Sequence, residues 1–123
     1  MLKINFFHIC ETAIIENQTG NMSIIGIFAN INAQKFPVIH PQMTIVAGFE
    51  ADKPGSYDVE LVFLDEQGEI LKSQAKINIG NNLKGNWFNK IVMYQIPRDL
   101  TQKIIIKHEG KDIHTGYLTI NNK

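Results

Sequence analysis

Short runs of alternating apolar and polar residues, separated by turn-forming residues about every ten positions, constrain the fold of this chain more than any other feature. In the clearest run, Met43–Glu50, every second residue from Met43 to Phe49 is apolar. An alternation with a period of two predicts a strand that buries one face. No segment has helical periodicity for longer than a turn or two, so we predict an all-β protein.

Several predicted strands have an inward face that the alternation defines clearly. Turns at Asp52–Gly55 and Asp65–Gly68 separate the first three of these strands. The last two form a hairpin with a predicted three-residue loop, Glu109–Lys111. The residues expected to face the core are Met43, Ile45, Ala47 and Phe49; Tyr57, Val59, Leu61 and Phe63; Leu71, Ser73, Ala75, Ile77 and Ile79; and Ile104, Ile106, Leu118 and Ile120.

Two other predicted strands carry apolar residues on both faces. This pattern in Leu2–Glu16 is typical of a strand with neighbours on both sides, and a break in its alternation near Glu11 or Thr12 predicts a bulge. In Trp87–Ile96 two apolar faces compete, so the orientation of this strand stays open. The two faces are Phe88, Val92, Tyr94 and Ile96 on one side and Trp87, Ile91 and Met93 on the other.

The isoleucine-rich segment Met22–Phe28 is predicted to form a buried strand that pairs with the first strand as a hairpin. Gly26 within it indicates a bulge or the close approach of another backbone. Residues 29–41 lose the alternation and contain Phe36-Pro37 and His40-Pro41, where proline keeps the preceding residue extended. We therefore predict an ordered crossover, which suits a chain that moves from one sheet to another.

Chain length and strand number together predict the fold class. With 123 residues, residues 1–123 are expected to form a single domain that is large enough to bury a core without disulfides. About eight short strands favour an immunoglobulin-like antiparallel β-sandwich. The Cys–Trp–Cys spacing of antibody domains is absent, so the prediction concerns the architecture alone.

The charge balance argues against nucleic acid and membrane as partners. Lys and Arg total 12, as do Asp and Glu, so the chain lacks the basic excess that binds nucleic acid or anionic lipid. No apolar run is long enough to span a membrane, and no signal-peptide pattern is present. Because Cys10 is the only cysteine and has no partner for an intramolecular disulfide, we expect a cytoplasmic protein.

The first half of the chain resembles a family of small bacterial proteins known only as a domain of unknown function. The resemblance rests on Ile9-Cys10-Glu11, on Ser23–Phe28, and on the pairs Phe36-Pro37 and His40-Pro41. It implies a single β-sandwich domain and no particular activity. An acidic residue often follows the Gly-x-Phe of the family pattern, whereas this chain has Ala29 there.

Candidate catalytic residues are few. Two histidines, His108 and His114, flank the last hairpin turn, and with His8 and Cys10 they could form a metal or catalytic site only if all four converge. The carboxylate pairs Asp58–Glu60, Asp65–Glu66 and Glu109–Asp112 lie on an outward face or in turns, where acids are ordinarily solvated. The sequence has no catalytic triad order and no phosphate-binding glycine loop, so we expect no cofactor.

Two polar loop segments are the best candidates for a binding surface, because loops on a rigid scaffold often carry function. The second is followed by a tryptophan, a residue that is enriched at binding surfaces, although its commoner role at such a position is to close one end of a sandwich. The candidate partner-binding residues are Asn30, Asn32, Gln34 and Lys35 in the crossover, and Lys84, Asn86 and Trp87 near the loop Gly80–Asn86.

The sequence favours a non-enzymatic binding or protein-interaction module whose partner is unknown. One alternative is a self-assembling structural component of a phage or mobile element, which predicts an oligomer with an apolar edge strand at its interface. A second alternative is a small metal- or ligand-dependent enzyme that uses the four His and Cys residues. Architecture alone does not choose among these functions.

Overall fold

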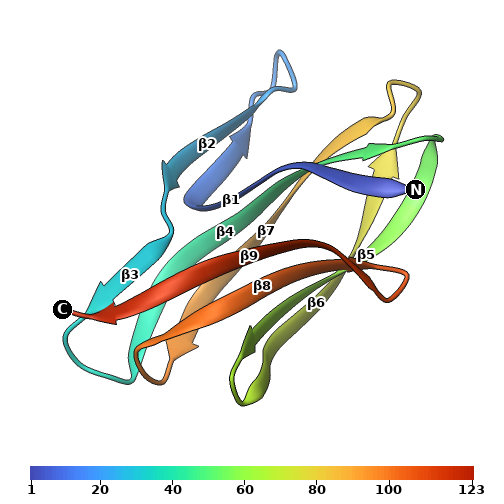
Figure 1. Ribbon diagram of the computed structural model, residues 1–123. Helices are drawn as coiled ribbons and strands as arrows, with labels where there is room; N and C mark the ends of the chain where they lie inside the picture. The colour runs from blue at the N-terminus through green and yellow to red at the C-terminus, as the bar shows by residue number, and fades with distance from the viewer.

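The computed structural model describes residues 1–123 and contains two β-sheets packed face to face, in which every strand pair but one is antiparallel (Figure 1). Every regular element is a strand, and no helix has the length and apolarity that crossing a membrane requires. The strands are β1 (Leu2–Ile15), β2 (Met22–Ile27), β3 (Asn30–Ala33), β4 (Val38–Ala51), β5 (Gly55–Asp65), β6 (Gly68–Ile79), β7 (Lys84–Ile96), β8 (Leu100–His108) and β9 (Lys111–Asn122).

The strand order is β2-β1-β4-β7 in one sheet and β3-β9-β8-β5-β6 in the other. This arrangement confirms the predicted all-β, immunoglobulin-like sandwich, although it has nine strands where we predicted about eight. The additional strand is β3, which lies within the predicted crossover and pairs parallel with β9. The crossover does move between sheets, but it is shorter than predicted because His40 and Pro41 already belong to β4.

The core lies between the sheets and contains the predicted inward faces. Met43, Ile45 and Phe49 of β4 have no exposed surface, and Phe63 of β5 packs in the same core. Residues on β5, β6, β8 and β9 complete it, including Val59, Leu61, Ile77, Ile79, Ile104, Ile106, Leu118 and Ile120. Removing these apolar side chains from water is the main contribution that the alternating residues make to the stability of the folded protein.

The loop of the last hairpin differs from the prediction, yet the faces of its strands do not. His108 pairs with Lys111, so the loop has two residues, Glu109 and Gly110, rather than three. The register then shifts between Ile106 and Lys107. This one-residue bulge compensates for the shorter loop, and the four predicted inward residues still reach the core.

A left-handed residue in β7 explains why two apolar faces competed in its sequence. Before Met93, Trp87 and Ile91 pack against the core; after it, Tyr94 and Ile96 do so. Met93 itself has φ of 54°, and this backbone reversal changes which side faces inward. Both competing faces are therefore correct, each for one half of the strand. The side chains that remain outside include Phe88 and Val92.

Strand β2 was predicted to be buried, and this prediction was wrong. It lies at the edge of the four-stranded sheet, pairs only with β1, and leaves Ile25 and Ile27 exposed. Gly26 has φ of 73°, and a Cβ there would lie 3.0 Å from Cγ of Glu11, so the close neighbour is a side chain and not the predicted second backbone. The register with β1 is continuous on both sides of Gly26, so the alternative prediction of a bulge is not met either. An isoleucine-rich edge strand has the same sequence pattern as a buried one, which explains the error.

The first strand, β1, pairs with two different strands along its length. β1 pairs with β4 as far as Cys10, and from there to Ile15 it pairs only with β2. Figure 1 shows the resulting β1–β2 hairpin extending beyond the rest of its sheet. Cys10 and Ala13 are three residues apart, so strict alternation would place them on opposite faces of the strand. Both nevertheless belong to one apolar cluster with Val46, so the alternation does change near the predicted position. The register shift against β4, however, lies between Ile4 and Phe6.

Candidate interaction surface

The four candidate residues of the crossover lie along β3 and the turn that follows it. Asn30, Asn32, Gln34 and Lys35 are all exposed. Asn32 accepts a hydrogen bond from the side chain of Asn121 (3.2 Å), which ties β3 to β9. These residues are accessible at one end of the sandwich, beside the start of β4.

The other three candidates lie at the opposite end of the molecule. Lys84 pairs with Glu50 near the end of β4, whereas Val38 at its start lies beside the crossover. The strand between them spans about 40 Å at the usual rise per residue. The two predicted groups therefore do not form one surface. Asn86 is exposed, as is Lys84.

Trp87 is partly buried and turns its ring toward the core. Its indole meets the ring of Phe49 edge to face, with centroids 6.3 Å apart. This contact corresponds to the second reading of the sequence, in which the tryptophan closes one end of the sandwich.

The four His and Cys residues do not converge. His8 and Cys10 lie on the outer face of the four-stranded sheet, opposite Val46 and Thr44 of β4. His114 stacks on Phe7, with ring centroids 4.5 Å apart. Nδ1 of His108 donates to the carbonyl oxygen of Asp58 (2.8 Å). No group of three or more His, Cys, Asp or Glu side chains is placed to hold a metal ion.

Cys10 has the surroundings of an unreactive thiol. The residue has no exposed surface, and its single S–H has two carbonyl acceptors within reach, that of Thr12 (3.3 Å from Sγ) and that of Thr44 (3.5 Å). Burial raises the pKa of this thiol, which favours the protonated form over the nucleophilic thiolate. Cys10 thus contributes packing to its cluster.

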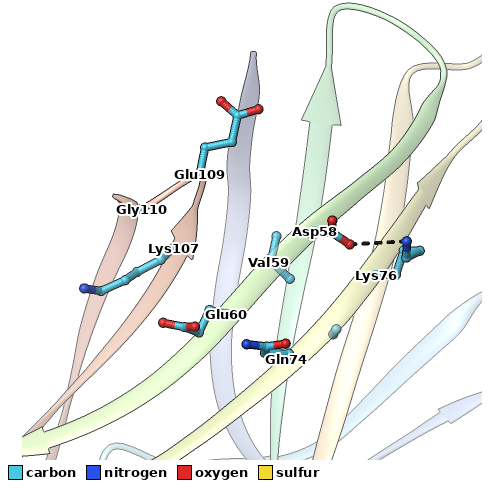
Figure 2. A pocket seen from close by; sticks show the side chains of 9 residues that line it. Asp58, Val59, Glu60, Gln74, Lys76, Lys107, Glu109 and Gly110 are labelled. Carbon is cyan, nitrogen blue, oxygen red and sulfur yellow. Dashed lines mark ion pairs between the residues drawn. The ribbon is translucent and has the colours of Figure 1, made fainter.

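A shallow groove of about 550 Å³ crosses the outer face of the five-stranded sheet, between β5, β6 and the β8–β9 turn. Figure 2 shows that Asp58 is paired with Lys76 (3.4 Å), while Lys107 and Glu109 point away from this pair. Glu60 forms a second ion pair with Lys72 (3.6 Å). These pairs leave a balanced, solvated surface, with no activated nucleophile beside a base.

The outer face of the four-stranded sheet is different because its centre is apolar. Cross-strand partners share a face, so His8, Val46 and Phe88 form one row across β1, β4 and β7. Phe6 lies in the next row and its ring is 6.0 Å from that of His8. Val46 has no exposed surface, whereas Phe88 is 40% exposed.

The same sheet also carries exposed apolar side chains at both of its edges. Ile14, Ile15, Ile25 and Ile27 are exposed on the β1–β2 hairpin, and Ile39, Val92 and Met93 on β4 and β7. Apart from Met1 and Tyr117, every exposed large apolar side chain of the protein belongs to this sheet. The sequence analysis did not predict this surface. The only indication was that Trp87–Ile96 has apolar residues on both of its faces, and the sequence did not show which face is exposed.

The family model of DUF6941, a family of unknown function, matches residues 5–121. The chain belongs to this family. The match confirms the resemblance to an uncharacterised family and extends it over nearly the whole chain. No curated protein matches the sequence significantly.

Solved structures with a similar fold include parts of larger enzymes. The Pseudomonas fluorescens alkylpurine DNA glycosylase AlkC, bound to DNA with an abasic site analog, has a TM-score of 0.58 and 10% identity over 98% of this DUF6941 member and 30% of the glycosylase. A Listeria innocua β-glucosidase in complex with gluconolactone has a TM-score of 0.57 and 6% identity, over 98% of this chain and 16% of the glucosidase. An immunoglobulin-like protein of Pseudomonas aeruginosa, 9% identical, covers 98% of this chain and 96% of its own, with a TM-score of 0.48.

This chain therefore spans less than a third of the glycosylase and a smaller part of the glucosidase. At such low identities the likeness concerns the fold alone.

Proposed function

We propose that this protein is a non-enzymatic protein-interaction module. Its contact surface is the outer face of the four-stranded sheet together with the β1–β2 hairpin. The observation that carries the proposal is the concentration of exposed large apolar side chains on this one sheet. Contiguous apolar patches on soluble domains commonly mark sites of protein contact.

The contrast between the two outer faces supports the same proposal. The five-stranded sheet exposes lysines and acids that pair with one another, such as Lys76 with Asp58. The four-stranded sheet has an ion pair as well, between Lys3 and Glu50, but it also exposes Phe88 and Val92. A protein whose other sheet has a solvated outer face gains no stability from exposing apolar side chains on this one. Such side chains become favourable when a binding partner covers them. The single unpaired thiol, Cys10, is compatible with a cytoplasmic location.

Site-specific photocrosslinking tests this proposal. A photoreactive phenylalanine analogue is placed at Phe88 and, as a matched control, at the exposed Gln74 of the other outer face, in cells of the source organism. We expect crosslinked protein from position 88 and none from position 74. Equal crosslinking from both positions, or none from position 88, would overturn the proposal.

A second candidate function is self-assembly as a structural component. It is favoured by β2, an edge strand without a charged residue or proline, since natural edge strands usually carry such residues to prevent pairing. An edge without this protection is suited to pairing with another strand.

A further inference from the structure

The four-stranded sheet has two free edges, β2 and β7. Each neighbouring pair in this sheet is antiparallel, so β2 and β7 run in opposite directions. A second copy placed beside the first by simple translation would therefore bring its β2 antiparallel to β7. Such a contact continues the sheet in the hydrogen-bonding pattern that it already has.

The two edges carry opposite charges. Residues 10–28, which form the β1–β2 hairpin and its exit, include Glu11 and Glu16 but no basic residue and no histidine. β7 includes Lys84 and Lys90 but no acidic residue. Neither glutamate forms an ion pair within the chain, and neither does Lys90. Charge complementarity therefore favours contact between unlike edges.

The strand register places specific residues opposite one another in such a contact. Ile27 pairs with Cys10, Cys10 with Thr44, and Thr44 with Lys90, so one row crosses the whole sheet. A copy added by translation brings Lys90 beside Ile27. Gly26 precedes Ile27, and the side chain of Glu11 lies against its backbone. The lysine of one copy would thus arrive next to the carboxylate of another.

We propose that the occupant of the free β2 edge is a second copy of this chain, which contributes its β7 edge head to tail. This inference rests on the second proposed function, self-assembly, and names its partner and register. Exposed apolar residues on both edges, Ile25 and Ile27 on β2 and Val92 on β7, become covered in the contact.

The predicted assembly is open-ended. A contact between two different edges is heterologous, so each added copy leaves one free edge at either end. Because β-sheets twist, successive copies are rotated and the array is helical. Pairing of β2 with another β2 is disfavoured, since it would bring Glu11 and Glu16 of both copies to the same interface.

Two blocking variants at exposed positions test the arrangement. Ile25→Lys places a charge on the β2 edge and leaves β7 free, whereas Val92→Glu places an acid on β7 and leaves β2 free. Sedimentation velocity of the wild-type protein over a concentration series should show a mass that grows without a fixed stoichiometry. Each variant alone should be a monomer, and an equimolar mixture should form 1:1 dimers.

Charge reversal tests the predicted contact between Glu11 and Lys90. Glu11→Lys or Lys90→Glu alone should raise the concentration needed for assembly about tenfold, because an attraction becomes a repulsion. The double variant Glu11→Lys/Lys90→Glu should restore assembly. Lys103→Glu, an exposed charge reversal on the other sheet, is the matched control and should change nothing.

Three results would overturn the head-to-tail arrangement. These are a wild-type monomer at every concentration, a closed dimer that Val92→Glu retains and Ile25→Lys abolishes, and an equimolar mixture of the two variants that stays monomeric. Circular dichroism of each variant verifies that it is folded. A monomeric wild type that still crosslinks to another protein from position 88 would refute this inference and leave the interaction module intact.

Discussion

Tyr94 donates a 2.6 Å hydrogen bond to Oε1 of Gln102 within the core, and both residues are buried. Burial is the main reason that the pKa of Tyr94 is raised to about 12. Nε2 of Gln102 has no hydrogen-bond partner in the protein. The bond to Tyr94 is therefore the favourable contact that offsets part of the cost of a buried amide.

Tyr94→Phe should lower the free energy of unfolding by about 1–3 kcal/mol, because it leaves both polar atoms of the Gln102 amide unpaired. Gln102→Leu in the Tyr94→Phe background should recover most of this loss, since an apolar side chain of similar size needs no partner. Urea unfolding of the single and double variants measures both effects. Additive losses in the double variant would contradict this account.

The ring of Phe6 covers Gly48 on the outer face of the four-stranded sheet. A Cβ at Gly48 would overlap Cε2 of Phe6, so Gly48→Ala should displace the ring and destabilise the protein by about 1–3 kcal/mol. The loss should be smaller in a Phe6→Ala background. Gly80→Ala is the matched control, because its nearest neighbour is 3.8 Å away and its φ is not in the left-handed region. Equal effects at the two glycines in thermal melts would refute the role of the ring.

The inward faces of β4 and β5 were predictable because the side of each strand that faces the other sheet lies in the core. Burial selects apolar residues at every second position, so Met43 and Phe63 stand in a pattern that only a strand produces. The loop of the last hairpin was not predictable in the same way. A two-residue turn with a bulge and a three-residue loop give the same alternation, and they differ only in backbone angles.

The exposed surface was harder to predict than the core. Ile25 on β2 and Val92 on β7 are of residue types that are usually buried, and only the strand order shows that they lie at the edges of a sheet. Strand order depends on contacts between distant segments, which local patterns do not encode. Asn32 and Asn86, which were predicted to lie in loops, are exposed but belong to strands β3 and β7. Their separation along β4 also follows from long-range pairing.

His114 should make stability depend on pH. Its ring stacks on Phe7, and burial lowers the pKa of His114 below the ordinary value of 6.5. The unfolded chain therefore takes up the proton more readily, so the stabilising contribution is complete above pH 6.5 and is lost as the pH falls below this value. The melting temperature should fall between about pH 7 and about pH 5.

The variant His114→Phe isolates this contribution, because it keeps an aromatic ring against Phe7 and cannot be protonated. Its melting temperature should fall less than that of the wild-type protein over the same pH range. Parallel slopes for the two proteins would show that the pH dependence has another source.

The turn residue Glu109 offers a stabilising substitution. Glu109 and Gly110 form the two-residue loop with φ of 52° and 77°, a conformation that an L-residue adopts at a cost of about 1–2 kcal/mol. Asparagine tolerates it better, so Glu109→Asn should raise the free energy of unfolding by about 0.5–1 kcal/mol. The contact of the Glu109 carboxylate with Nε2 of His108 (3.6 Å) is an ion pair only with a protonated histidine, and because the glutamate is exposed it contributes little.

Glu109→Gln separates the backbone effect from the loss of charge. Glutamine removes the carboxylate but keeps a long side chain with no preference for the left-handed region, so its stability should match that of the wild-type protein. Urea unfolding of the three proteins side by side decides the point. If glutamine stabilised the protein as much as asparagine, the gain would come from removing the carboxylate charge from the groove that Asp58 and Glu60 also line, and the explanation from backbone conformation would fail.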